Sequence, residues 1–138
     1  MTTTPFDPAA DLAPLPFETE HLDAAKHLKA CGLPWTPHVG CFVWDENTFI
    51  KVASPFPNRI YFILSMARFL NIFNTIENMQ NHLVWLPTWH QARLLCAHLE
   101  IDNHKISDIF AESRAASAGG DLLFLYNLLA EALKQKKF

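Results

Sequence analysis

The residues best suited to chemistry in this chain are a histidine and a cysteine that lie close together in the sequence. His38 and Cys41 are separated by two residues in the segment HVGC. A histidine beside a cysteine can lower the thiol pKa and position a thiolate for attack. The same two side chains are ligands for zinc and similar ions. Cys41 also opens an aromatic segment typical of a strand, where a buried and inert thiol is the ordinary expectation.

The spacing of the seven histidines and three cysteines does not complete a metal site. The chain contains neither HExxH nor a CxxC pair, so His38 and Cys41 would need a distant third ligand. His82, His90 and His98 could supply one after folding, but histidines that bind backbone carbonyls are far more frequent. We therefore predict no metal and no cofactor.

Two further classes of enzyme are excluded by missing motifs. The four glycines stand at positions 32, 40, 119 and 120, so neither GxGxxG nor GxxxxGK[ST] can be written anywhere in the chain. GxSxG is also missing, and no serine lies in a recognisable nucleophile elbow. The usual phosphate-binding loops and the serine hydrolases are therefore not expected.

Charge is distributed unevenly along the chain. Residues 1–25 contain five acids and no lysine or arginine, whereas residues 47–99 contain one acid, Glu77, against four cations: Lys51, Arg59, Arg68 and Arg93. We favour an interpretation in which the acidic segment pairs with these cations, within or between subunits. The alternative is that Arg59 and Arg68 hold a small anionic ligand, since guanidinium offers bidentate donors to carboxylate or phosphate.

A segment rich in aromatic and histidine residues surrounds a Leu-Pro-Thr turn at 86–88. If this segment lines a pocket, it supplies Trp85, Trp89 and His90 as candidate binding residues. The full set of candidates is His38, Cys41, Arg59, Arg68, Trp85, Trp89 and His90. The turn also has a purely structural interpretation, because Thr88 followed three residues later by Gln91 has the form of a capping box. We favour the structural interpretation, in which a helix begins at Trp89.

The elements that must position these residues are short. Acids in the first turn and Gly32 after the last turn predict a helix over about residues 18–31. CFVW and FIKVA, on either side of DENT, predict a hairpin over about residues 41–53. For Arg59 to Phe73 we favour a strand and then a helix capped by Ser65 over one continuous helix. The remaining predicted elements are a helix from Asn74 to about His82, a strand near 84–86, and helices over 89–99 and 122–137.

Length and composition predict one small domain. The chain has 138 residues, a size that suits a single hydrophobic core. Four of the nine prolines fall within the first sixteen residues and make regular structure there improbable. We therefore predict a proline-rich arm over 1–16 and a single compact α+β domain over 17–138. In that domain a small antiparallel sheet, with strands in the hairpin and near 60–64 and 84–86, packs with four to five helices.

Charge and hydropathy limit the classes of partner and the cellular compartment that we expect. A net charge of −3 gives no positive field that would attract nucleic acid or an anionic membrane surface. The most apolar run, 60–73, contains Arg68 and is shorter than the ~20 residues needed to span a bilayer. Three cysteines without a pairing pattern, and no export-type segment at the N-terminus, predict reduced thiols in the cytoplasm.

The aromatic surplus over residues 42–89 leads to the functional expectation. Half of the residues are hydrophobic and 18% are charged, so a small interior is expected to leave apolar surface that a second copy would cover. We therefore expect a small cytoplasmic binding or interaction protein that acts as a homo-oligomer. The alternative is an enzyme with a pocket lined by His, Cys and Trp residues, acting on a small substrate that can be an anion.

Overall fold

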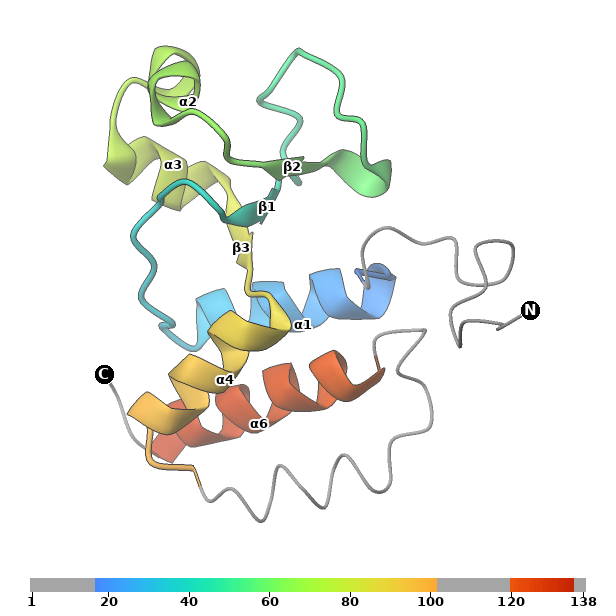
Figure 1. The fold of residues 1–138 in the computed structure, drawn as a ribbon, viewed down its shortest axis with the longest axis vertical. Coiled ribbons are helices and arrows are strands. Elements are labelled where there is room, and N and C mark those ends of the chain that lie inside the picture. The colour runs from blue at the N-terminus through green and yellow to red at the C-terminus, as the bar shows by residue number, and fades with distance from the viewer. Residues whose placement is uncertain (1–16, 102–119, 136–138) are drawn as a thin grey trace, which may run out of the picture.

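The computed structural model describes residues 17–101 and 120–135 and shows an α+β fold (Figure 1). The described elements, in chain order, are α1 (Thr19–Ala30), β1 (Phe42–Trp44), the 3-10 turn η1 (Pro57–Arg59), β2 (Ile60–Phe62), α2 (Met66–Phe73), α3 (Ile76–His82), β3 (Val84–Leu86), α4 (Trp89–His98) and α6 (Gly120–Gln135). The three strands form one antiparallel sheet in the order β2-β1-β3. The predicted fold class is thus confirmed, and the predicted arm over 1–16 lies outside the described residues.

The elements are arranged in three layers, with the sheet between α1, α4 and α6 on one face and α2 and α3 on the other (Figure 1). Successive side chains of a strand point to opposite faces, so each short strand serves both sides. Ile60, Val84 and Leu86 pack into the larger core with α1, α4 and α6. Val43 and Tyr61, which are paired in register, pack into the smaller core with α2 and α3.

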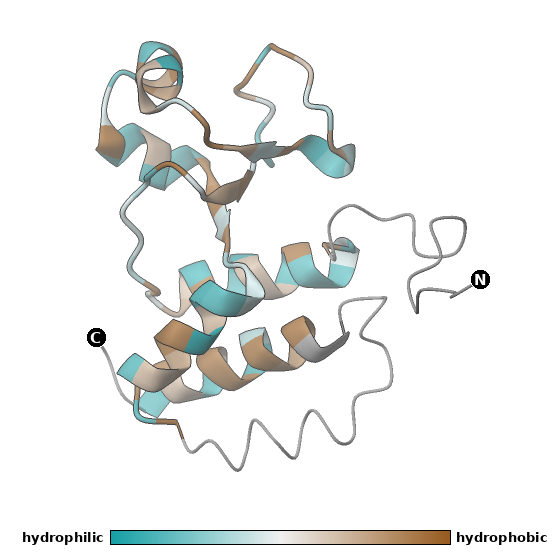
Figure 2. Ribbon diagram, viewed as in Figure 1, coloured by the Kyte–Doolittle hydropathy of each residue, from teal (hydrophilic) through white to brown (hydrophobic). Residues whose placement is uncertain are grey.

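The larger core takes more of its described buried residues from α6 than from any other element, and Figure 2 shows this helix as largely apolar. The buried face of α6 contains Leu122, Leu125, Tyr126, Leu129 and Leu133. The Tyr126 hydroxyl donates a hydrogen bond to the carbonyl of Pro87 and so ties this helix to the turn before α4. Complete burial raises the pKa of Tyr126 well above its ordinary value. No helix within 17–101 or 120–135 combines the length and the apolar character needed to cross a bilayer.

Helix ends follow the sequence signals closely. In α4 the Gln91 backbone N–H donates to Thr88 Oγ1 at 3.2 Å, and the Thr88 backbone N–H donates to Gln91 Oε1 at 2.9 Å, which completes the predicted capping box. Ser65 caps α2 as predicted. Gly32, with φ of +91°, ends α1 in the left-handed conformation that glycine adopts without strain.

The start of α3 differs from its prediction by one residue. Thr75 is the N-cap, and its Oγ1 accepts a hydrogen bond from the Asn78 backbone N–H at 3.1 Å. Asn74 instead ends α2 with a φ of +71°, a conformation that asparagine tolerates better than most residues. The two helices therefore meet across Asn74 and Thr75, and of these two the Thr75 side chain forms the cap of α3.

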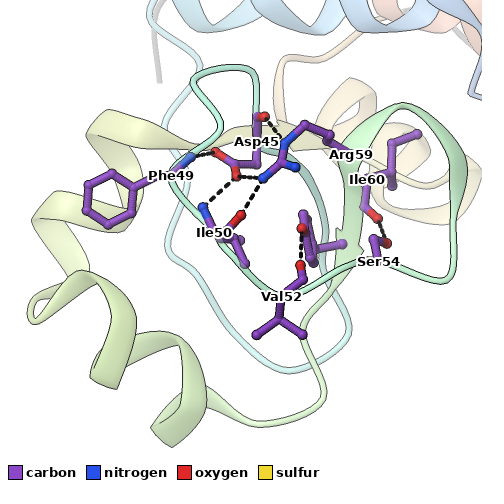
Figure 3. A network of polar contacts seen from close by, with 8 residues as sticks. Asp45, Phe49, Ile50, Val52, Ser54, Arg59 and Ile60 are labelled. Atoms are coloured by element: carbon purple, nitrogen blue, oxygen red, sulfur yellow. Dashed lines mark hydrogen bonds and ion pairs between the residues drawn. The ribbon is translucent and has the colours of Figure 1, made fainter.

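One detail of the predicted sheet is corrected. β1 lies where the first strand of the hairpin over 41–53 was predicted, but it pairs with β2 and β3, and residues 49–53 form no strand. The buried Asp45 carboxylate accepts hydrogen bonds from the backbone N–H groups of Phe49 at 3.0 Å and Ile50 at 2.7 Å (Figure 3). Arg59 donates to Asp45 Oδ2 at 2.7 Å and to the Ile50 carbonyl. The side chains of Asp45 and Arg59 thus bind backbone groups of residues 49 and 50, which in the predicted hairpin would have paired with β1.

Replacing Asp45 tests the importance of this network. Asp45→Asn keeps the size of the side chain but turns one acceptor oxygen into a donor, so a buried backbone N–H loses its partner in either orientation of the amide. We expect a loss of about 2–3 kcal/mol in the free energy of unfolding, measured by urea denaturation. The matched control is Glu46→Gln at the exposed pair with Lys26, which we expect to change stability by less than about 1 kcal/mol. Equal stability of the two variants would contradict the role assigned to Asp45.

The capping box at α4 generates a second stability prediction. Thr88→Ala removes the side-chain acceptor for the Gln91 backbone N–H and is expected to cost about 1 kcal/mol in urea unfolding. Thr19→Ala, at the exposed first position of α1, removes the same atoms and should change stability by no more than about 0.5 kcal/mol. A Thr88→Ala protein as stable as the Thr19→Ala protein would show that the box does not hold the helix start.

Candidate functional site

Two hollows meet at a pair of tryptophans. The inner pocket has a volume of about 240 Å³ and is lined by Ala25, Lys29, Leu33, Pro34, Trp35, Gln80, Leu83 and Trp85. The outer groove has a volume of about 670 Å³ and is lined by Pro34, Trp35, Thr36, His38, Trp85, Gln91, Leu94, Leu95 and His98. Pro34, Trp35 and Trp85 line both, so the two hollows are neighbours, and we treat them together as the candidate site. The volume of the outer groove lies in the range typical of ligand pockets.

Four elements and one link position the walls of this site. The second half of α1 and the link that follows it, 33–36, form one side of the inner pocket, and α3 and β3 form the other. The amide Nε2 of Gln80 on α3 donates to the backbone carbonyl of Trp35 at 2.5 Å and fixes the link. The face of α4 that carries Leu94 and His98 lines the outer groove.

The indoles of Trp35 and Trp85 are the most unusual feature of the site. Their rings are nearly parallel, with an angle of 11° between the planes and 6.3 Å between the centroids. Both indole N–H groups are buried, and neither has a hydrogen-bond partner. Buried polar groups are ordinarily paired, and each unpaired donor costs about 1–3 kcal/mol.

Lys29 brings a positive charge to the inner pocket. Its Nζ donates to the backbone carbonyls of Asn81 at 3.1 Å and Leu83 at 3.0 Å, where α3 ends and β3 begins. Partial burial lowers the pKa of Lys29, and the field of Glu46 opposes that shift. An ammonium group has three donors, so two carbonyls leave one proton for a further acceptor.

Only two of the seven predicted binding residues, His38 and Trp85, line this site. Arg59 is bound to Asp45, and Arg68 is exposed on α2. In the first turn of α4, Trp89 packs against the larger core while His90 is exposed. The predicted pairing of the central cations with the acidic segment over 1–25 is not seen at Arg59, whose described partner is Asp45.

The thiol hypothesis for His38 and Cys41 is not supported by their surroundings. Cys41 is fully buried in the smaller core, whereas His38 is exposed and its Nδ1 is hydrogen-bonded to the Val39 carbonyl at 2.8 Å. Burial also raises the pKa of the Cys96 thiol to about 11, so this group stays protonated near neutral pH. Within the described ranges, no three His, Cys, Asp or Glu side chains come together to hold a metal ion.

Sequence reasoning missed the residues that give the site its character, Trp35 and Lys29. One signal for Trp35 was available, since a large aromatic residue in the proline-flanked link LPWTP cannot be explained by the periodicity of a helix or strand. The contact of Lys29 with the carbonyls at the end of α3 had no local signal.

Comparison with protein-family models, with curated proteins and with solved structures found no match to this chain. A function must therefore be argued from the chemistry of the site, because a fold class alone does not imply one.

The burial of the cysteines predicts a pattern of alkylation. Iodoacetamide should modify Cys31 in the native protein, because this thiol is half-exposed at the end of α1, and should spare the buried Cys41 and Cys96. All three should react in urea, as read by peptide mass spectrometry. Cys31→Ser should leave the native protein unmodified. Rapid modification of Cys41 in the native protein would contradict its burial and would support the thiol hypothesis.

Proposed function

We propose that this protein is a binding protein that holds a small apolar ligand in the inner pocket, which the ligand enters from the outer groove. The observation that carries the proposal is the Trp35–Trp85 pair, whose nearly parallel rings line both hollows.

The size and walls of the inner pocket support an apolar occupant. A cavity of about 150 Å³ lined by apolar side chains is enough to bind benzene, and this pocket has about 240 Å³. Six of its eight lining residues are apolar or aromatic; Lys29 and Gln80 are the other two. This combination of apolar walls and few polar groups is the usual composition of a ligand site.

Binding is favoured over catalysis because the walls lack an activated nucleophile. Covalent catalysis needs a nucleophile within hydrogen-bond reach of a base. Among the described residues that line the two hollows there is no cysteine or serine, and the buried Cys41 lies in the smaller core. The pocket expected for an enzyme, with His, Cys and Trp in its walls, therefore lacks its thiol.

Association into homo-oligomers stays a separate prediction on which this proposal does not depend. Many aromatic residues that suggested it pack within the protomer: Phe42 contacts Phe62 with ring centroids 4.7 Å apart, and Phe49 stacks on Phe73 at 4.8 Å. Leu64 is among the side chains that remain exposed. The described residues that line the proposed ligand site all belong to one protomer.

The proposal is tested by following the indole N–H signals of the four tryptophans by ¹⁵N–¹H NMR. Trp35→Phe and Trp85→Phe assign the two signals. The probes are three molecules with the same body, namely 4-phenylbutyrate, 4-phenylbutan-1-ol and 4-phenylbutylamine. We expect at least one of them to shift the signals of Trp35 and Trp85 in a saturable manner, and to leave Trp44 unchanged.

A steric pair of variants provides the control. Leu94→Trp narrows the outer groove, whereas Leu64→Trp adds the same side chain at another exposed leucine that lines neither hollow. Slower or weaker binding in the Leu94 variant and unchanged binding in the Leu64 variant would support entry through the groove. If none of the three probes shifts the Trp35 and Trp85 signals, the proposed function is wrong.

A further inference from the structure

We infer that the ligand is a small organic anion, with a flat apolar body in the inner pocket and a carboxylate-type group bound to Lys29. This inference rests on the proposed function and adds the chemical class of the ligand. It follows from three properties of the site, which are the sign of its charges, the geometry around Lys29 and the shape of the walls.

The described walls contain a cationic group but no acid. None of the described residues that line the two hollows is an aspartate or a glutamate, whereas Lys29 lines the inner pocket. A cationic ligand would find no carboxylate among these residues and would lose its hydration without compensation. An anion would find the ammonium group of Lys29.

Lys29 is held in a position suited to an anionic group. Its two hydrogen bonds to the carbonyls of Asn81 and Leu83 fix Nζ at the wall that α3 and β3 share with the inner pocket. Glu46, the acid whose field acts on Lys29, is paired with Lys26 at 2.6 Å and lines neither hollow. The positive charge of Lys29 is therefore not neutralised within the pocket.

The protonation of Lys29 agrees with this arrangement. Partial burial lowers the pKa of Lys29 because the ammonium loses part of its hydration. An anion placed beside the ammonium raises the pKa again and gains a charge-assisted hydrogen bond. A neutral ligand would bury the same ammonium further and gain neither effect.

The shape of the tryptophan pair indicates how the body of the ligand lies. The two indoles are parallel and their centroids are 6.3 Å apart. A third ring between them would need about 7 Å, because stacked carbon atoms approach to about 3.5 Å. The ligand must therefore lie against the pair, beside Leu33 and Leu83, with space for one or two rings.

The head-group series tests the charge of the ligand on the unmodified protein. The three phenylbutyl probes differ only in the terminal group, so the ratio of their dissociation constants, from NMR titration, isolates the effect of charge. We expect the carboxylate to bind about tenfold more tightly than the alcohol, and the amine to bind most weakly. Binding of the alcohol or the amine as tight as that of the carboxylate would overturn the anion while leaving the proposed function intact.

A matched pair of lysine variants tests the residue. Lys29→Gln keeps an amide donor for the carbonyls of Asn81 and Leu83 but removes the charge. Lys51→Gln removes a charge at an exposed position that lines neither hollow and leaves the pair of Lys26 with Glu46 intact. We expect Lys29→Gln to weaken carboxylate binding about tenfold without changing alcohol binding, and Lys51→Gln to change neither. Unaltered carboxylate binding by a folded Lys29→Gln protein, with folding checked by the urea midpoint, would show that Lys29 does not bind the anion.

Discussion

The whole arrangement depends on a sheet that is buried on both faces although its three strands have three residues each. So small a ladder contributes little stability by itself, and sheets of this size need packing to persist. Here the alternation of side chains divides the apolar residues between two cores, with α6 and its neighbours on one side and α2 and α3 on the other. Because β3 lies at the edge of the sheet, its Trp85 is available to the link after α1. The position of the candidate site is therefore a consequence of strand order.

Local interactions were the part of this fold that could be predicted from the sequence. The capping residues Thr88 and Ser65, the glycine at the end of α1 and the apolar face of α6 all act within a few residues of the chain, so their signals are visible in the letters. The strand near 84–86 was likewise predicted, from a short apolar segment between two helices.

Long-range partnerships were not predictable in the same way. The partner of β1 was misassigned because Asp45 looks like an ordinary loop acid, and only folding brings Arg59 to it. The candidate site was only half found because Gln80 and Trp35, which are 45 residues apart, meet through the packing of α3 against the link. Arg59 and Arg68 were plausible anion ligands by residue type. One is engaged with Asp45 and the other lies on an exposed helix face, and residue type cannot reveal either fact.

The bond from the Tyr126 hydroxyl to the Pro87 carbonyl has a consequence for how the chain folds during synthesis. The larger core takes six of its described buried residues from α6, the last described helix, so this core stays incomplete until that helix has left the ribosome. The described residues of the smaller core all lie within 35–85, so this core can close earlier. Translation is slow, at about 5–20 residues per second, so the nascent chain passes through a stage in which half of the molecule is packed and the other half is exposed to chaperones.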